Sequence, residues 1–370
     1  MKIGILTQPI ETNYGGILQA YALQEVLRRL GHNVSTINIH IYPMQKVNIR
    51  YLLDYIKRNI KHYVLGNEVS TKFKTYLSKE DYERTSINIK PFIQQNIKLT
   101  RPFEELKSLN FLDEFEFDAI VVGSDQVWIP TFCPEYFLSF AESWDIKRVA
   151  YAASFGHTEW RMSEEITYKC KRLAQKFSSI SVREESGIDL CKKYLGVEAK
   201  HVLDPTMLLT ADDYLNIIKY NSSRTKTLFS YVLDSTIIKK NVVKQVAEYL
   251  SLEIFSTLDD SGITNKHYIV PPIDDWICGI KNSQFVVTDS FHGTVFSILF
   301  NKPFIVLGNR NRGMARFESL LKLFNIEERL VYDLNNIRSV LSKEIDYQKI
   351  NQKIEILRLE SLNFISSSLH

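Results

Sequence analysis

Short apolar runs alternate with longer segments of helical periodicity over most of the chain. Residues 3–6, 119–122 and 285–287 are rich in aliphatic or aromatic side chains and are typical of buried strands. Segments such as residues 17–30 and 238–250 follow strands and are typical of helices. This alternation predicts an α/β fold, a parallel and doubly wound sheet with helices on both faces.

The alternation runs through two separate parts of the chain. The 370 residues are long enough to bury two hydrophobic cores. We therefore expect two Rossmann-like domains facing across a cleft, formed by residues 1–209 and 225–345. The polar stretch between them, residues 210–224, is the expected hinge. A C-terminal helix is expected over residues 346–370.

The stretch TDSFHGTVFS at residues 288–297 is the strongest candidate for a functional site. The strand before it stops at Asp289 and Ser290, two residue types that cap helices. His292 and Gly293 are then expected at a turn, with a helix over residues 294–300. Open α/β sheets bind ligands at the carboxyl ends of their strands, and a helix N-terminus there favours an anion. The alternative is a helix cap whose histidine fills a polar gap.

Composition narrows the class of protein. A hydrophobic fraction of 45% and a charged fraction of 24% are typical of globular proteins, and a net charge of +3 is too small to indicate nucleic-acid binding. The four cysteines contain no C-x-x-C pair, which argues against a zinc site and a disulfide framework. The chain opens on MKIGILT without signal-peptide features, and no apolar run is long enough to span a bilayer. We therefore expect a cytoplasmic protein.

Residues 50–76 form a basic segment that fits neither set of strands. Its apolar residues recur at helical spacing, with Lys57, Arg58 and Lys61 largely on the other side. A surface helix packed on the N-terminal domain explains this pattern. A helix that contacts the inner membrane surface or a lipid-linked substrate explains it as well. We expect a basic helical insertion over about residues 50–100.

Several motifs occur in order along the chain: NYGGILQAYAL from residue 13, VVGSDQVW from 121, YAASFG from 151, SVREESG from 181, LDPT from 203, and SFHG from 290. Together they resemble the polysaccharide pyruvyl transferases, from residue 13 to about residue 329. The resemblance implies a GT-B-like architecture. It also implies an enzyme that uses phosphoenolpyruvate as co-substrate, without a cofactor or metal. Its product would be a pyruvate ketal on a sugar of a bacterial surface polysaccharide or its lipid-linked precursor.

Ketal formation needs cations for a carboxylate and a phosphate, an acid, and a base for the sugar hydroxyls. His292 matches the histidine of the family motif and is the expected general acid/base. Asp125, at the end of a strand, is expected to be the base for an acceptor hydroxyl or to orient it; a helix cap is the alternative. Asp204 in LDPT is interpreted as structural.

The donor side should be cationic. Arg183 follows a strand and suits bidentate binding of an anion, with a salt bridge to Glu184 or Glu185 as the alternative. Ser290 stands where one version of the motif has arginine, so one anion contact must come from elsewhere, or from the Ser290 hydroxyl and backbone N–H groups. Arg310, Arg312 and Arg316 follow the strand at residues 304–306 and can supply it; a flexible, solvated loop is the alternative. The expected donor-binding residues are Arg183, Ser290, Gly293, Arg312 and Arg316.

The acceptor side should recognise a sugar. Gln126 can bond hydroxyls through its amide, and Trp128 can stack on a sugar ring. The first strand-to-helix loop lacks G-x-G-x-x-G, so it does not indicate a dinucleotide site. We expect that loop, Asn13, Tyr14, Gly15 and Gly16, to line the acceptor side.

Two other classes of function remain. A GT-B glycosyltransferase with a nucleotide sugar would share the architecture and the phosphate-binding arginines. A non-catalytic carbohydrate-binding protein would leave His292 without a role. A dehydrogenase is disfavoured because the nucleotide fingerprint is missing.

Overall fold

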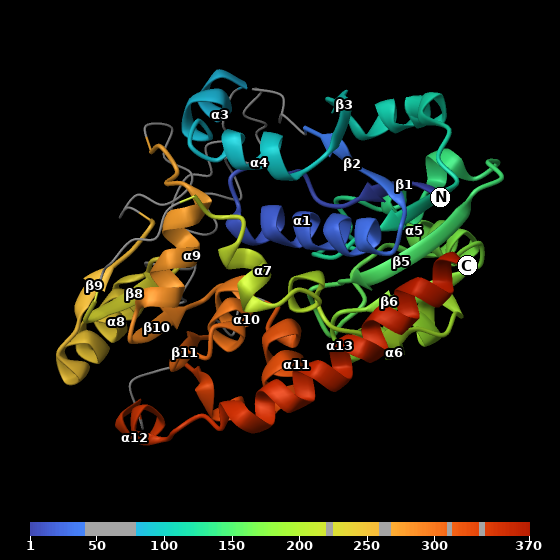
Figure 1. Cartoon of the computed structure of the whole chain (residues 1–370). Coiled ribbons are helices and arrows are strands. Elements are labelled where there is room, and N and C mark those ends of the chain that lie inside the picture. Colours follow the sequence, from blue (N-terminus) through green and yellow to red (C-terminus); the bar gives the residue numbers. More distant parts are fainter. Residues whose placement is uncertain (41–78, 220–224, 259–267, 309–312, 333–336) are drawn as a thin grey trace, which may run out of the picture.

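The computed structural model of the chain contains two parallel β-sheets, one in each half (Figure 1). It describes residues 1–40, 79–219, 225–258, 268–308, 313–332 and 337–370. The N-terminal sheet has the order β3-β2-β1-β4-β5-β6-β7 and the C-terminal sheet the order β12-β11-β10-β8-β9, with all pairs parallel. Two Rossmann-like units of α/β architecture are therefore confirmed.

The strands have these bounds: β1 Lys2–Leu6, β2 Asn33–Ile39, β3 Leu99–Phe103, β4 Ala119–Val122, β5 Lys147–Ala153, β6 Ser179–Val182, β7 Lys200–His201, β8 Thr227–Tyr231, β9 Glu253–Phe255, β10 Phe285–Thr288, β11 Phe304–Leu307 and β12 Leu330–Val331. The helices are α1 Tyr14–Arg29, α3 Lys79–Thr85, α4 Lys90–Asn96, α5 Glu164–Ala174, α6 Ser186–Leu190, α7 Ala211–Leu215, α8 Ile237–Leu250, α9 Ile273–Asn282, α10 Phe291–Leu299, α11 Ala315–Phe324, α12 Ile337–Ser342 and α13 Tyr347–Leu369.

Each sheet reverses its strand order at one place. In the N-terminal sheet the chain moves outward from β1 to β2 and β3, and later from β4 onward in the opposite direction. In the C-terminal sheet the reversal lies between β8 and β10. The loops after such neighbouring strands separate, and this leaves a crevice where doubly wound sheets bind ligands. Leu6 pairs with Val122 and Tyr231 with Thr288, so the strands on both sides of each crevice end at the same level.

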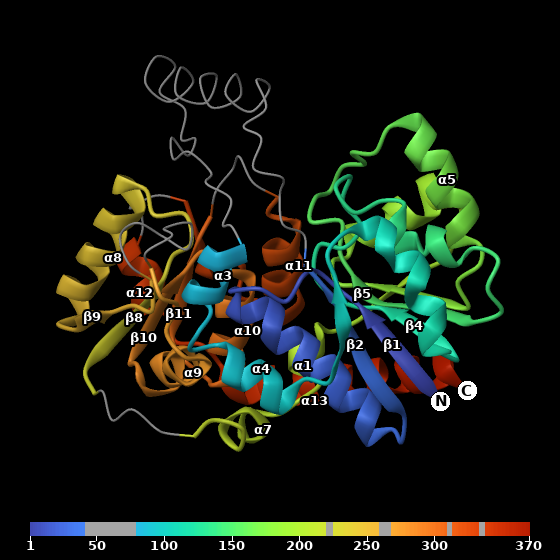
Figure 2. The same ribbon diagram turned by 90° about the horizontal axis from the view of Figure 1, so that it is seen from above.

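One cluster of buried hydrophobic residues spans both halves, and each half also has a cluster of its own. Helix α1 packs against α10 of the C-terminal half, and Tyr214 packs edge-on against Phe296. Helix α13 starts beneath the C-terminal sheet and runs back to β5, so both chain termini lie in the N-terminal half (Figures 1 and 2). Arg358 on α13 is buried and donates to the backbone oxygens of Met207 and Leu209. The chain thus crosses between the halves a second time.

Local structure agrees with the sequence pattern at α1. Asn13 caps this helix by accepting hydrogen bonds from the backbone N–H groups of Gly15 and Gly16. The helix ends before Gly31, whose φ of +87° lies in the left-handed region that favours glycine.

Other local expectations are wrong. Helix α10 begins at Phe291, because the Ser290 hydroxyl accepts the N–H of Gly293; His292 therefore lies in its first turn rather than in a loop before it. Strand β3 is not among the predicted strands; its sequence LTRPF contains a proline, which is tolerated because β3 is an edge strand.

The basic segment at residues 50–76 lies outside the described residues.

Candidate active site

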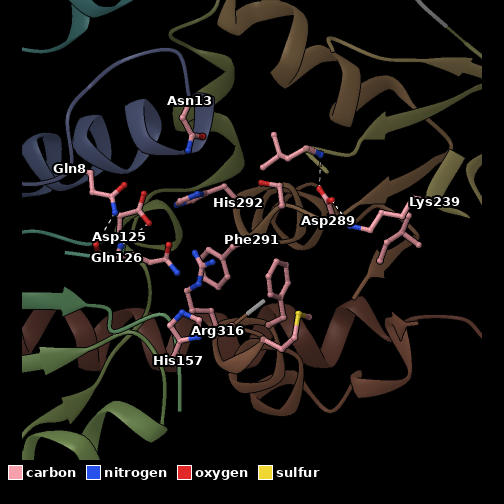
Figure 3. Close-up of a pocket in the computed structure, with 16 residues that line it drawn as sticks. Gln8, Asn13, Asp125, Gln126, His157, Lys239, Asp289, Phe291, His292 and Arg316 are labelled. Carbon is pink, nitrogen blue, oxygen red and sulfur yellow. Dashed lines mark hydrogen bonds and ion pairs between the residues drawn. The ribbon is translucent and has the colours of Figure 1, made fainter. Parts of the chain in front are cut away.

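A cavity of about 450 Å³ opens between the carboxyl ends of the two sheets (Figure 3). Its N-terminal wall includes Gln8 after β1 and Asp125 after β4. Its C-terminal wall includes Leu233 after β8 and His292 after β10. Both points of strand reversal therefore face the same cavity, which places it where both sheets would bind a ligand.

His292 extends from the N-terminus of α10 toward the N-terminal half (Figure 3). Its Nε2 lies 3.7 Å from the Oδ2 of Asp204, which is an ion-pair distance rather than a hydrogen bond. The ring also lies against Gly15, where a Cβ atom would stand 2.2 Å from Nδ1. A histidine of one half is thus held by two segments of the other half.

Arg183 joins the carboxylates that surround this histidine. Its side chain is 1% exposed, and its Nη1 donates to Asp204 at 2.7 Å. Its Nη2 donates to Asp125 at 3.3 Å. The partners of Arg183 are therefore not Glu184 and Glu185. Glu184 accepts hydrogen bonds from the loop after β5, and Glu185 pairs with Lys322.

The carboxylates remain ionised in this buried site. Burial alone would raise the pKa of Asp204, but His292 and Arg183 outweigh it and hold that pKa well below its usual range. The pKa of Asp125 is also lowered, because Arg183, His292 and Arg316 together exceed the effect of its burial. Asp125 has a φ of +81°, which is uncommon for a non-glycine residue and requires support from its surroundings.

Arg316 supplies a cation that faces the cavity. Its guanidinium lies 5.7 Å from the ring centre of Phe291, and within the described part of the chain its buried Nε has no hydrogen-bond partner. Burial and Arg183 lower the pKa of Arg316 to about 10, so it keeps its charge at neutral pH. A buried N–H donor without a partner, beside a cavity, suits an anionic ligand.

Comparison with known proteins decides the family. A sequence model described as polysaccharide pyruvyl transferase matches residues 13–311, which is most of the chain. The chain belongs to the polysaccharide pyruvyl transferase family. Among proteins of curated function, no significant relative was found.

Solved structures show the architecture of this pyruvyl transferase. The UDP-GlcNAc 2-epimerase of Methanocaldococcus jannaschii in complex with UDP-GlcNAc and UDP is similar at 14% identity and a TM-score of 0.51, covering 97% of this chain and 93% of that one. The UDP-GlcNAc 2-epimerase of Neisseria meningitidis bound to UDP-GlcNAc matches at 13% identity with a TM-score of 0.48, covering 98% of this chain and 100% of that one. The expected GT-B-like fold is confirmed.

The structure brings part of the expected site of this transferase together. The expected residues that line the cavity are Asn13, Asp125, Gln126, Ser290, His292 and Arg316. Arg310 and Arg312 lie outside the described residues. Gly293 is buried within α10, and Gly16 lies in the first turn of α1 next to its cap.

Two aromatic residues expected at the acceptor side lie in the core instead. Trp128 stacks on Phe137 and donates its indole N–H to the backbone oxygen of Tyr136. Tyr14 is buried and its hydroxyl donates to the backbone oxygen of Pro271. Neither side chain lines the cavity, so neither ring is presented to a sugar there.

Sequence reasoning missed several cavity residues. Gln8 donates to the backbone oxygen of Gln126, and His157 shares a hydrogen bond with Arg161. Burial and the charges of Arg161 and Arg316 lower the pKa of His157. At the other end of the cavity Lys239 pairs with Asp289 at 2.7 Å (Figure 3). Gln8, His157 and Asp289 share one signal, which is a position shortly after a strand, whereas Lys239 lies in the first turn of α8.

The described ranges contain no group of three His, Cys, Asp or Glu side chains that could hold a metal ion. Within the same ranges, no helix is both long enough and apolar enough to cross a membrane.

Proposed function

We propose that this pyruvyl transferase forms a cyclic pyruvate ketal on a sugar, using phosphoenolpyruvate as donor. The acceptor is a bacterial surface polysaccharide or its lipid-linked precursor. The observation that carries the proposal is a cavity in which His292, an ionised Asp125 and the buried Nε–H of Arg316 meet; among the described residues, that N–H has no hydrogen-bond partner. These groups suit proton transfer beside an anion.

The reaction balances without an electron acceptor. Carbon C3 of phosphoenolpyruvate gains a proton and becomes a methyl group, while C2 forms bonds to two sugar oxygens. The bond between C2 and the phosphate oxygen breaks. Of the two hydroxyl protons, one is equivalent to the proton gained at C3 and the other leaves with phosphate. The protein must therefore move protons and hold negative charge.

The C-terminal wall is the donor side in this proposal. Arg316 offers its buried Nε and the N-terminus of α10 offers backbone N–H groups to a carboxylate or phosphate. His292 stands beside this anion site and protonates C3. The Ser290 hydroxyl is used by the helix cap, so Arg316 supplies the charge that an arginine at that position would give.

The N-terminal wall is the acceptor side. Gln8, Asn13 and Gln126 line it with amides that can bond sugar hydroxyls. The lowered pKa of Asp125 makes its carboxylate a weak base, so it accepts a hydrogen bond from an acceptor hydroxyl and orients it. A volume of about 450 Å³ leaves room for a sugar beside the small donor.

Calorimetric titration tests the donor assignment. Phosphoenolpyruvate should bind the purified protein, and Arg316→Met should weaken that binding. UDP-GlcNAc, titrated separately, should bind more weakly than phosphoenolpyruvate. Tight binding of UDP-GlcNAc with no binding of phosphoenolpyruvate would support the nucleotide-sugar glycosyltransferase instead.

A further inference from the structure

Asp204 has more partners than a helix cap requires. Its Oδ1 accepts hydrogen bonds from the backbone N–H and the hydroxyl of Thr206, which caps the short helix Pro205–Met207. Its Oδ2 accepts from Arg183 at 2.7 Å and from the Ser124 hydroxyl at 2.9 Å. The same Oδ2 faces His292 across the boundary between the halves. The carboxylate is thus immobilised with one oxygen directed at the histidine.

The two ring nitrogens of His292 have different surroundings. Nε2 is buried and, among the described residues, has no hydrogen-bond partner, although it lies 3.7 Å from Asp204. Nδ1 lies on the side of Gly15, and His292 is one of the residues that line the cavity. A buried polar nitrogen without a partner is costly, and a small movement of the ring would give Nε2 a charged acceptor.

We propose that Asp204 is a positioning residue that accepts the Nε2–H of His292, fixes the ring tautomer, and leaves Nδ1 to exchange protons with the substrate. The role in substrate protonation rests on the proposed function, whereas the tautomer does not. The separation of 3.7 Å is longer than a hydrogen bond, and catalytic hydrogen bonds often shorten when substrate binds.

Other charged groups around the ring agree with this assignment. Asp125 follows β4 and Arg316 lies on α11, and both line the cavity with His292, while Arg183 follows β6 and lies behind the two carboxylates that it pairs with. Arg183 bonds to both carboxylates, and Arg316 faces the cavity. Among the described carboxylates, Asp204 lies within ion-pair distance of Nε2, and its side chain is 1% exposed. A water molecule therefore cannot easily replace Asp204 as the hydrogen-bond acceptor for Nε2.

The tautomer is measured directly by ¹⁵N NMR of histidine-labelled protein, with His292→Asn identifying the signals. At a pH where the ring is neutral, we expect the wild-type ring to be protonated at Nε2. Asp204→Asn should change the tautomer populations, while Asp274→Asn, which alters another buried carboxylate away from the site, should not. Wild-type protonation at Nδ1 would overturn the proposal without any variant, and so would unchanged populations in folded Asp204→Asn.

A double-mutant cycle tests the link to catalysis. Asp204→Asn should lower kcat at least about tenfold, up to about four orders of magnitude, with a smaller change in KM. In a His292→Asn background, the same substitution should cost nothing further in kcat. An equal loss in both backgrounds would show a structural role. If the protein proves inactive toward phosphoenolpyruvate, the proposed function fails while the NMR result stands.

Discussion

At the scale of single residues, Arg316 and Arg183 carry the same charge in different settings. Arg316 faces the cavity and has an unpaired buried Nε within the described part of the chain. We predict that Arg316→Met weakens phosphoenolpyruvate binding about tenfold or more, because one charge-assisted hydrogen bond is worth about 1.5–3 kcal/mol. The unfolding free energy should change little. Calorimetry measures the affinity for phosphoenolpyruvate, and denaturant unfolding measures the unfolding free energy. Unchanged affinity would remove Arg316 from the donor site.

Arg183 should behave in the opposite way. Replacing it with methionine leaves Asp125 and Asp204 buried without their cation, which typically costs about 3–5 kcal/mol. The matched control is Arg29→Met, because Arg29 is half exposed in its pair with Asp213 and such pairs contribute about 0–1 kcal/mol. Arg183 was predicted to bind the donor but does not line the cavity. Normal stability with lost donor binding in Arg183→Met would support that sequence-based prediction instead.

The same carboxylates give the wild type an acid-sensitive stability. Both folded-state pKa values are lowered below the unfolded value of about 3.9. Their contribution is therefore fully present above about pH 4 and is lost as the pH falls through the lower folded values. Arg183→Met should show a weaker loss of stability in that acid range.

At the scale of elements, the first turn of α1 controls the position of His292. A Cβ on Gly15 would stand 2.2 Å from Nδ1, whereas the nearest atom to a Cβ on Gly16 is at 3.7 Å. We predict that Gly15→Ala displaces the ring and lowers kcat strongly, while Gly16→Ala leaves activity near wild type. Both changes replace a helical glycine by alanine, so backbone propensity is matched.

Steady-state kinetics of the two glycine variants decide this point. Equal activity of both variants would mean that contact between α1 and α10 does not hold the histidine.

The sequence predicted elements whose signals are local. Strand β10, the capping residue types around Ser290, and α1 with its end before Gly31 follow from residues close together in the chain. The predicted start of α10 is one turn too late, because His292-Gly293 suggested a turn although Ser290 caps a helix that already includes both residues; Asp289 instead accepts from the loop after β8.

Contacts between distant segments could not be predicted in this way. Asp125 follows β4, Arg183 follows β6 and Asp204 follows β7. The hydrogen bonds of Arg183 to the two carboxylates therefore form only because these three strands end at the same edge of the sheet. The position of Trp128 could not be predicted either. Its place near Asp125 in the sequence suggested stacking on a sugar, but the indole packs on Phe137 in the core. Gln8 and His157 have no distinctive motif, and only the topology places them at the cavity.

At the scale of the whole molecule, the site exists only where the two halves meet. His292 comes from the C-terminal half, while Asp204, Asp125 and Gly15 come from the N-terminal half. The common core and the returning helix α13 hold the halves together. Any change in their separation would alter the distance between His292 and Asp204, so the geometry for proton transfer depends on the assembled molecule.

Attachment to a membrane stays a prediction, since the basic segment lies outside the described residues. Each cation near an anionic surface contributes about 1 kcal/mol, so Lys57, Arg58 and Lys61 with their neighbours would give reversible, salt-sensitive binding. Co-sedimentation with anionic vesicles should decrease at high salt and in a variant with these residues changed to glutamine. Equal, negligible binding to anionic and neutral vesicles would indicate an ordinary surface helix.

Turnover of phosphoenolpyruvate labelled with ¹³C at C2, with the polysaccharide fraction of the source strain as acceptor, tests the central claim most directly. We predict phosphate release and transfer of the label to a quaternary ketal carbon of the glycan. His292→Asn should reduce this rate by about two to four orders of magnitude while remaining folded. Unchanged phosphoenolpyruvate together with consumption of a nucleotide sugar by the wild-type protein would contradict the assignment.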